Sequence, residues 1–255
     1  MRRIWDCMMY RDEADMLAMH LEETPQVHKY VLVESNITHR GDPKPWNYMG
    51  DYPDRVITVR TEIDPELTPW QIEHTQRDAA LGALEAAGAD LDDVVIISDV
   101  DKIPSQTALA WTGWPVVSLR MRTTLYAVDW VVPDDKLPSQ AVMCTLRFLK
   151  SMAGSSLSWA LDNRHRFPQL GDGGWHFSWL GGPEKQAEKL DTGTCHTEIL
   201  DTPEAALIRS GARYRDGADG GGLPVVAAVV DSTWPAMIRE RRCPPEWFRP
   251  AEVAA

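Results

Sequence analysis

Two aspartates, Asp99 and Asp101, follow the most apolar run of the sequence, Val-Val-Ile-Ile at residues 94–97. Hard cations such as Mg²⁺ and Mn²⁺ prefer oxygen ligands and often share one or two carboxylates with substrate phosphates. This spacing therefore suits a cation that binds a diphosphate, because the cation reverses the repulsion between an acidic cleft and an anionic ligand. A solvated turn after a strand is the alternative that the residues leave open.

Three further groups of residues carry polar side chains that could act on a ligand. Glu34 ends a short apolar run and opens a polar loop, and His176 follows two glycines among aromatic residues. Lys189, His196 and Glu198 form the third group. Loops at strand ends often carry function, and histidine can ligate a metal or transfer a proton. The alternatives are a polar surface loop, a structural histidine and a solvated helix face, respectively.

Glu73 and Arg77 are four residues apart in a stretch with helical character. At this spacing the two side chains lie on the same face of a helix. The pair predicts either an exposed ion pair or an arginine that binds a diphosphate.

The first hundred residues predict the elements that position these groups. Apolar runs predict strands at residues 3–9, 30–33, 55–59 and 94–97, and helical spacing predicts helices at 14–21 and 69–87. Asp12 is predicted to cap the first helix, and Gly88 to end the second. This order indicates an α/β fold with a mostly parallel sheet, in which ligands bind outside the carboxyl ends of the strands.

The remainder of the chain has a less regular pattern. It predicts strands at 116–119 and 125–132, a helix at 137–150, a loop at 162–182, a helix at 184–190 and a flexible connector at 217–222. There is no internal repeat. We expect a single domain over residues 1–255, with a Gly/Pro-rich tail from about residue 217.

Composition narrows the functional class. The 255 residues are 44% hydrophobic and 25% charged, which excludes disorder as the main state. The net charge of −12 makes a general nucleic-acid or anionic-membrane binder a poor candidate. We expect no membrane span, no signal peptide and a cytoplasmic location. The four cysteines form no C-x-x-C pair, so we expect reduced thiols and no structural zinc site.

The order of several short motifs resembles glycosyltransferase family 17, whose eukaryotic members are the β-1,4-mannosyl-glycoprotein 4-β-N-acetylglucosaminyltransferases. The resemblance runs from about residue 4 to 200, and it rests on residues 6–7, 12–17, 21, 31–35, 38–41, 44–45, 97–104, 126, 130, 174–179, 189 and 196–198. It implies a GT-A fold, a Rossmann-like αβα sandwich with a mostly parallel central sheet. We expect no counterpart of the eukaryotic membrane anchor, and therefore a soluble bacterial or phage-type member.

The resemblance also implies a reaction. It would be a metal-dependent, inverting transfer of N-acetylglucosamine or a related hexose from a nucleotide sugar, most simply a UDP-sugar, with Mn²⁺ or Mg²⁺. The acceptor would be a carbohydrate or glycoconjugate, in the cytoplasm of a bacterium or of a phage-infected host.

Roles follow by the same analogy. The nucleoside would lie near Met9, Glu13 and Glu34, and the diphosphate near Arg77 and Lys189. Asp99 would reach the ribose or the metal, Asp101 would hold the metal, and His176 would be a further metal ligand with His196 as its competitor. Inversion needs a base that takes the acceptor proton, for which Asp129, Asp172 and Glu198 are the candidates.

Three rival interpretations remain open at this point. A transferase acting on a modified phage DNA base would use the basic residues Arg239, Arg241 and Arg242, against the overall negative charge. A nucleotide-sugar-binding module would keep the fold without turnover. A metal-dependent phosphohydrolase would need a second carboxylate cluster that the sequence does not display.

Overall fold

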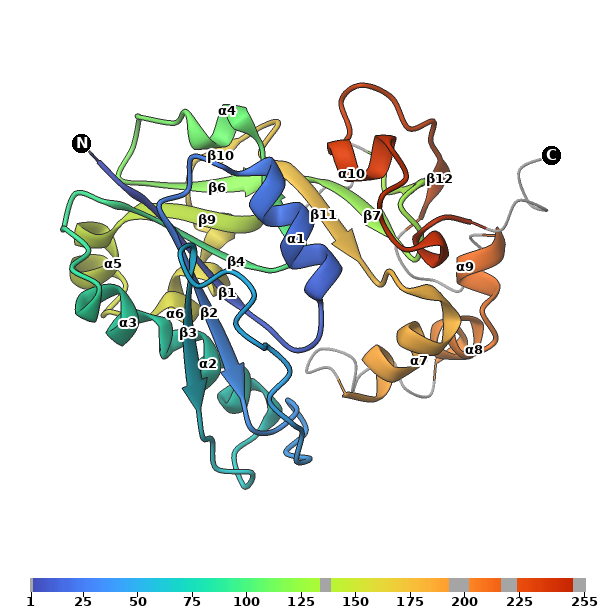
Figure 1. Cartoon of the computed structure of the whole chain (residues 1–255), viewed down its shortest axis with the longest axis horizontal. Coiled ribbons are helices and arrows are strands. Elements are labelled where there is room, and N and C mark those ends of the chain that lie inside the picture. Colours follow the sequence, from blue (N-terminus) through green and yellow to red (C-terminus); the bar gives the residue numbers. More distant parts are fainter. Residues whose placement is uncertain (1, 134–138, 193–201, 217–223, 250–255) are drawn as a thin grey trace. The chain divides into compact units, whose positions relative to one another are not determined.

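The structure is a computed structural model that describes residues 2–133, 139–192, 202–216 and 224–249 (Figure 1). The chain divides into two compact units. Unit 1 comprises Met1–Met121 and Pro138–Gly174, and unit 2 comprises Arg122–Leu137 and Trp175–Ala255. Each unit is described by itself below, and the expected single domain stays a prediction.

Unit 1 is built on a seven-stranded sheet with the order β10-β6-β9-β4-β1-β2-β3. The strands are β1 (Ile4–Met9), β2 (Lys29–Ser35), β3 (Val56–Thr61), β4 (Val94–Asp99), β6 (Val116–Arg120), β9 (Ser139–Thr145) and β10 (Gln169–Leu170). Strands β4, β1, β2 and β3 are parallel, whereas β9 is antiparallel to both β4 and β6. The predicted α/β fold with a mostly parallel sheet is therefore confirmed.

The other elements of unit 1 are short. They are α1 (Ala14–Glu23), α2 (Pro69–Asp78), α3 (Ala80–Ala86), α4 (Gln106–Leu109), α5 (Leu146–Met152), α6 (Leu157–Asp162), the strand β5 (Lys102–Pro104) and a 3-10 turn at Arg164–Arg166. The single helix predicted at 69–87 is wrong in one respect, because Ala79 separates α2 from α3. Gly88 follows with a φ of 74°, as a glycine at the end of a helix should.

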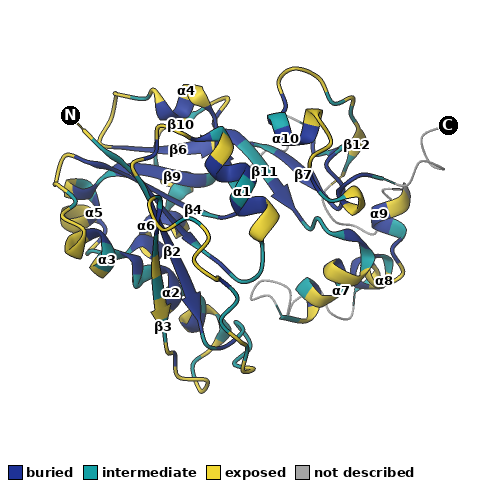
Figure 2. Ribbon diagram, in the orientation of Figure 1, coloured by how far each residue is buried: buried dark blue, intermediate teal, exposed yellow. Residues whose placement is uncertain are grey.

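The two faces of this sheet bury different kinds of side chain. Because successive residues of a strand point to opposite faces, Trp5 and Cys7 share one face of β1 and Asp6 and Met8 the other. Trp5 and Cys7 belong to the apolar core that also includes residues of α3, α5 and α6. His20 of α1 contacts Asp6, so α1 packs on the opposite face. The inner strands β1, β2, β4 and β9 are mostly buried, whereas the edge strand β3 is largely half-buried or exposed (Figure 2).

Unit 2 contains a second group of strands, β7 (Arg122–Leu125), β8 (Trp130–Val131), β11 (Gly174–Ser178) and β12 (Val226–Ala227). Strands β7 and β11 are parallel, and β8 is antiparallel to β7 and β12. The helices are α7 (Gly182–Thr192), α8 (Pro203–Arg209), α9 (Ala212–Asp216) and α10 (Ala236–Arg239), and a 3-10 turn follows at Pro245–Trp247.

A buried polar cluster supports the helices of unit 2. Glu204 accepts hydrogen bonds from the Tyr126 hydroxyl at 2.5 Å and from Nε of Arg213 at 2.7 Å. The guanidinium of Arg213 also lies over the Tyr126 ring, 4.9 Å from its centroid. Pairing of this kind offsets the cost of burying a charge.

Several predicted elements of the second half are wrong. The helix predicted at 137–150 is strand β9 followed by α5, and the loop predicted at 162–182 contains β10 and β11. The strand predicted at 125–132 is interrupted between β7 and β8. Strand β9 is buried on both faces at residues 141–144, so it lacks the alternation that would have distinguished it from a helix. The predicted connector at 217–222 lies outside the described residues.

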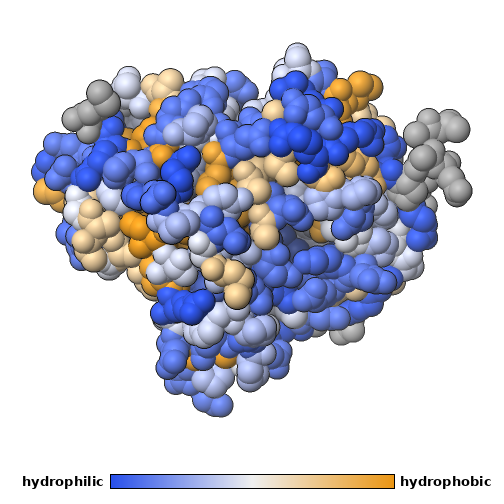
Figure 3. Space-filling view, viewed as in Figure 1, coloured by the Kyte–Doolittle hydropathy of each residue, from blue (hydrophilic) through white to orange (hydrophobic). Residues whose placement is uncertain are grey.

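The face in view is polar, and three of the cysteines are described. The face in Figure 3 is largely hydrophilic. Over the part of the chain that the structure describes, no helix has both the length and the apolar character needed to cross a membrane. Cys7, Cys144 and Cys243 are free thiols and are buried.

Candidate functional site

The strand ends at which the sequence predicted ligand binding meet in unit 1. Strand β1 is flanked by β2 and β4, and Met9 at its end is the register partner of Val33 on one side and of Asp99 on the other. The chain passes outward from β1 through β2 to β3 and then returns to β4 on the other side of β1. Such a reversal of strand order creates a crevice outside the carboxyl ends of the two strands. Met9, Glu34 and Asp99 therefore lie at one edge, as the sequence predicted.

The Asp99 carboxylate is paired with two basic side chains. Nη1 of Arg77 donates to its Oδ1 at 2.8 Å, and Nζ of Lys102 donates to its Oδ2. Burial alone would raise the pKa of this carboxyl, but the charges of Arg77 and Lys102 hold the pKa well below its usual range. Asp99 is thus a carboxylate whose charge is balanced from within the protein.

Arg77 is a buried residue of α2 that contacts the strand-end edge by its ion pair with Asp99. Its side chain is 3% exposed, and its other contacts are the Ser98 carbonyl at 3.2 Å and Oε1 of Glu73 at 2.9 Å. Glu73 and Arg77 therefore form the predicted ion pair, but the prediction that the pair is exposed is wrong, because the arginine is buried beneath the strand ends. The predicted contact of Arg77 with a diphosphate stays a prediction.

One face of α2 connects the ends of β2 and β4. Gln76 donates to the Val33 carbonyl at 2.9 Å, and its Oε1 lies 3.2 Å from both the Ser35 hydroxyl and Nε2 of His39. Burial lowers the pKa of His39, while the charge of Glu73 opposes that shift. Residues 76 and 77 lie on the same face as residue 73, because they are three and four positions after it in the helix.

Glu34 is fully buried and organises the loop that follows β2. Its Oε1 accepts from the backbone nitrogen of Asn47 at 2.5 Å and from Nζ of Lys44 at 3.3 Å, and its Oε2 accepts from the backbone nitrogen of Tyr48 at 3.3 Å. The Asn47 side chain donates to the Arg11 carbonyl at 2.7 Å. Glu34 therefore fixes residues 44–48 against the segment after β1.

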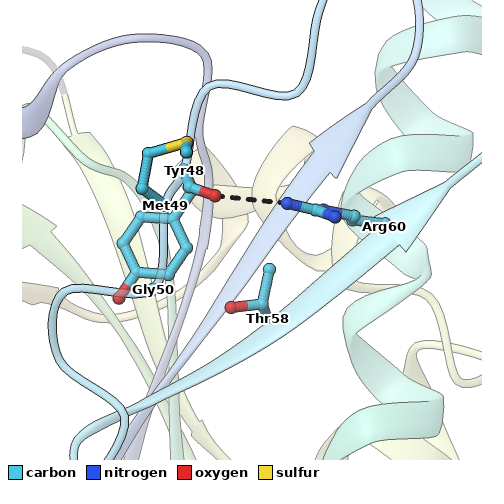
Figure 4. Close-up of a pocket in the computed structure, with 5 residues that line it drawn as sticks. All are labelled: Tyr48, Met49, Gly50, Thr58 and Arg60. Carbon is cyan, nitrogen blue, oxygen red and sulfur yellow. Dashed lines mark hydrogen bonds between the residues drawn. The ribbon is translucent and has the colours of Figure 1, made fainter.

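A shallow cavity of about 320 Å³ lies beside this loop (Figure 4). Its lining residues are Tyr48, Met49, Gly50, Thr58 and Arg60. Nη2 of Arg60 donates to the Tyr48 carbonyl at 3.3 Å, as the dashed line in Figure 4 indicates. Arg60 is the register partner of Glu34, so the cavity borders the strand that ends in the buried carboxylate.

The residues nearest the start of α1 are held by their own loop. Oε2 of Glu13 accepts from the backbone nitrogens of Arg11 and Asp12 at 2.9 and 3.1 Å. Glu13, and not Asp12 as predicted, is the N-cap residue, since it directly precedes Ala14, the first residue of the helix.

Asp101 lies in the tight turn that joins β4 to β5 and is partly buried. No group of three or more His, Cys, Asp or Glu side chains within the described ranges is placed to hold a metal ion. A cation at this turn would therefore need ligands from the substrate or from water in addition to Asp101.

Asp172 is in unit 1 but contacts a different segment. Its Oδ2 accepts from the Thr107 hydroxyl at 3.1 Å, and its carbonyl accepts from the Ser105 hydroxyl at 2.5 Å. The residue is exposed and has a φ of 53°. These contacts place it beside the start of α4.

The other described candidates are in unit 2. Asp129 accepts from Nε of Arg249 at 2.7 Å. His176 is a partly buried residue of β11 and the register partner of Thr123, and the ammonium of Lys189 lies 5.7 Å from the Trp179 ring centroid. His196 and Glu198 lie outside the described residues.

Several residues of the edge were not singled out in advance for a role there. They are Asp6, His20, His39, Lys44, Gln76 and Lys102. The available signals were the closeness of Lys102 to Asp99 in the chain and the positions of His39 and Lys44 in the polar loop after Glu34. The other contacts arise from helices α1 and α2 packing on the sheet.

The comparisons with known proteins return a solved structure and a family model. No curated protein matches the chain. A solved structure, the apo-form glycosyltransferase GlyE of Streptococcus pneumoniae TIGR4, is similar with a TM-score of 0.34 and 8% identity. That similarity covers 91% of this chain and 55% of the GlyE chain, so the chain spans about half of that protein.

The central sheet and its strand-end edge are consistent with a GT-A-like fold. The family model for glycosyltransferase family 17 matches residues 1–180, well over half of the chain and all of the edge described above. On this match the chain belongs to glycosyltransferase family 17.

Proposed function

We propose that this glycosyltransferase moves N-acetylglucosamine or a related hexose from a UDP-sugar to a hydroxyl of a carbohydrate or glycoconjugate, with inversion and with the help of Mn²⁺ or Mg²⁺. The observation that supports the proposal most is the position of Asp99 and Asp101. They lie at the carboxyl end of β4, next to the end of β1, where the strand order reverses. This is the edge at which such sheets bind nucleotides.

The residues of the turn suit a cation held by one protein carboxylate. Arg77 and Lys102 already balance the charge of Asp99, so we assign the cation to Asp101. Mg²⁺ is commonly held by one or two carboxylates together with substrate phosphates and water. When bound, the cation would stabilise the charge of the departing diphosphate.

The protein's own groups would orient the donor. Met9 and the loop that Glu34 fixes lie at the same edge and would line the nucleoside site. Arg77 would set the orientation of Asp99, which we place toward the ribose. Lys189 remains the candidate cation of unit 2 for the diphosphate.

Inversion by a single displacement needs a base for the acceptor hydroxyl. Asp129, Asp172 and Glu198 remain the candidates. Asp129 is paired with Arg249, whereas Asp172 is exposed and accepts one hydrogen bond from a threonine. Replacement by Asn or Gln should abolish turnover at the true base while leaving the affinity for UDP unchanged.

Calorimetry with UDP tests the proposal. The wild-type chain should bind UDP more tightly when Mn²⁺ is present, and Asp101→Asn should remove that gain while the protein stays folded. Asp92→Asn is the matched control, because Asp92 is exposed in a surface ion pair with Arg147 and loses the same charge. Equal affinities with and without Mn²⁺ in the wild type would contradict the metal-dependent mechanism.

A further inference from the structure

A carboxylate and an imidazole are buried together beneath the Asp99–Asp101 turn. Asp6 of β1 and His20 of α1 are both 0% exposed, and Nε2 of His20 lies 2.9 Å from Oδ2 of Asp6. Well-packed hydrophobic residues of similar volume often replace such a pair without loss of stability. Its presence in the core of unit 1 therefore calls for a reason other than stability.

The second contact of each residue supplies that reason. Nδ1 of His20 lies 3.1 Å from the carbonyl oxygen of Val100, the residue between the two aspartates. The Ser98 hydroxyl donates to Oδ1 of Asp6 at 3.2 Å. The pair thus contacts the chain immediately before Asp99 and immediately after it.

The hydrogen bonds define where the hydrogens lie. A carbonyl oxygen only accepts, so Nδ1 of His20 carries a hydrogen that it donates to Val100. Oδ1 of Asp6 accepts from the Ser98 hydroxyl, and its Oδ2 shares a hydrogen bond with Nε2 of His20. Each ring nitrogen therefore has its own partner, the Val100 carbonyl for Nδ1 and the Asp6 carboxyl group for Nε2.

The ring itself is held in place. Tyr30 packs against it edge to face at a centroid distance of 5.9 Å, and the Tyr30 hydroxyl donates to the Thr24 carbonyl at 2.7 Å. His20 therefore presents Nδ1 to Val100 from a fixed position, and the Val100 carbonyl would lose its donor if the imidazole were removed.

We propose that Asp6 and His20 are positioning residues that fix the Val100 peptide and so set the orientation of Asp101 toward the cation of the nucleotide complex. This inference rests on the proposed role of Asp101 as the ligand of that cation. Asp6 acts through His20 and Ser98, and His20 acts through the backbone of Val100.

Two substitutions of His20 separate its two contacts. An asparagine places its amide nitrogen near the position of Nδ1, so His20→Asn retains the donor toward Val100 and loses the one toward Asp6. A glutamine places its nitrogen near the position of Nε2, so His20→Gln retains the donor toward Asp6 and leaves the Val100 carbonyl unpaired. Each variant should therefore be the more impaired of the two in one measurement and the less impaired in the other.

The first measurement is the affinity of Mn²⁺ in the presence of UDP. We expect His20→Gln to weaken it about tenfold and His20→Asn to change it less than threefold. The second is thermal stability, for which we expect His20→Asn to lose more than His20→Gln, because it strands a buried carboxylate. Met19→Ala, at a fully buried position of the same helix, is the control that lowers stability without lowering the affinity.

Hydrogen exchange in the ligand-free protein separates this inference from the proposed function. The peptide over residues 98–102 should exchange faster in His20→Gln than in the wild type or in His20→Asn. The exchange result could hold in a wild-type protein that does not bind Mn²⁺ with UDP. In that case the proposed function fails, and the Asp6–His20 pair only orders the turn, which overturns the positioning role proposed for the pair. An affinity that falls in step with stability across the three variants, or that His20→Gln leaves unchanged, would also overturn it.

Discussion

The guanidinium of Arg77 lies 2.8 Å from the Asp99 carboxylate, with the arginine 3% and the aspartate 28% exposed. The arginine belongs to α2 and the aspartate ends β4, so this ion pair connects a helix of unit 1 to the strand-end edge. Lys102 completes the charge balance of Asp99 from the other side of the turn.

Removal of Arg77 should destabilise unit 1. Arg77→Met leaves Glu73 and the partly exposed Asp99 without their shared cation, and we expect a loss of about 2–3 kcal/mol in the free energy of unfolding. Arg77→Lys should recover part of that loss, because it keeps the charge but not the two-sided geometry. Urea unfolding of the three proteins measures both effects, and an Arg77→Met variant as stable as the wild type would contradict the assignment.

Asp99 should also give stability a dependence on pH. Its pKa in the folded state lies below its unfolded value of about 3.9. The stabilisation is therefore fully present above about pH 5, and it is lost as the pH falls through the folded pKa.

Asp99→Asn provides the comparison for this pH dependence. The variant lacks the titrating carboxyl group of Asp99 and so cannot lose its stabilisation on acidification. Its free energy of unfolding relative to that of the wild type should therefore rise as the pH falls from 5 to 3. The other carboxylates titrate in both proteins, so urea unfolding at each pH isolates Asp99 by difference. If the free energies of unfolding of the two proteins changed in parallel with pH, the pairing of Asp99 with Arg77 and Lys102 would be contradicted.

The sequence predicted the edge of this site better than its internal contacts. Apolar runs end at Met9, Glu34 and Asp99, so local pattern was enough to place these residues at the ends of parallel strands. The contacts of Asp6 with His20 and of Arg77 with Asp99 join residues far apart in the chain. They depend on how α1 and α2 pack on the sheet, which no local pattern encodes.

Glu34 should control the loop at residues 44–48. Glu34→Ala removes the acceptor of two backbone donors and of Lys44, which should cost about 2 kcal/mol of stability. Loss of the anchor should also speed proteolysis near the exposed Met49 and raise the KM for the donor. Glu34→Gln keeps one acceptor and should be intermediate. Wild-type proteolysis rates in Glu34→Ala would show that the loop is held by other contacts.

His176 was predicted as a further metal ligand, with His196 as its competitor, and both assignments stay predictions. Titration of Mn²⁺ in the presence of UDP should show a loss of affinity of about tenfold in His176→Ala and little change in His196→Ala, since a lost ligand must be replaced by water. The reverse order would assign the role to His196. No change in either variant would leave Asp101 as the protein ligand together with the diphosphate.

The most direct test of the central claim is a crystal structure of the wild-type chain grown with UDP and Mn²⁺, with anomalous diffraction used to locate the metal. We expect an anomalous peak within bonding distance of the Asp101 carboxylate and of the diphosphate oxygens, with Met9 and the loop at residues 44–48 beside the nucleoside. A nucleotide bound elsewhere, or a metal that does not contact Asp101, would contradict it.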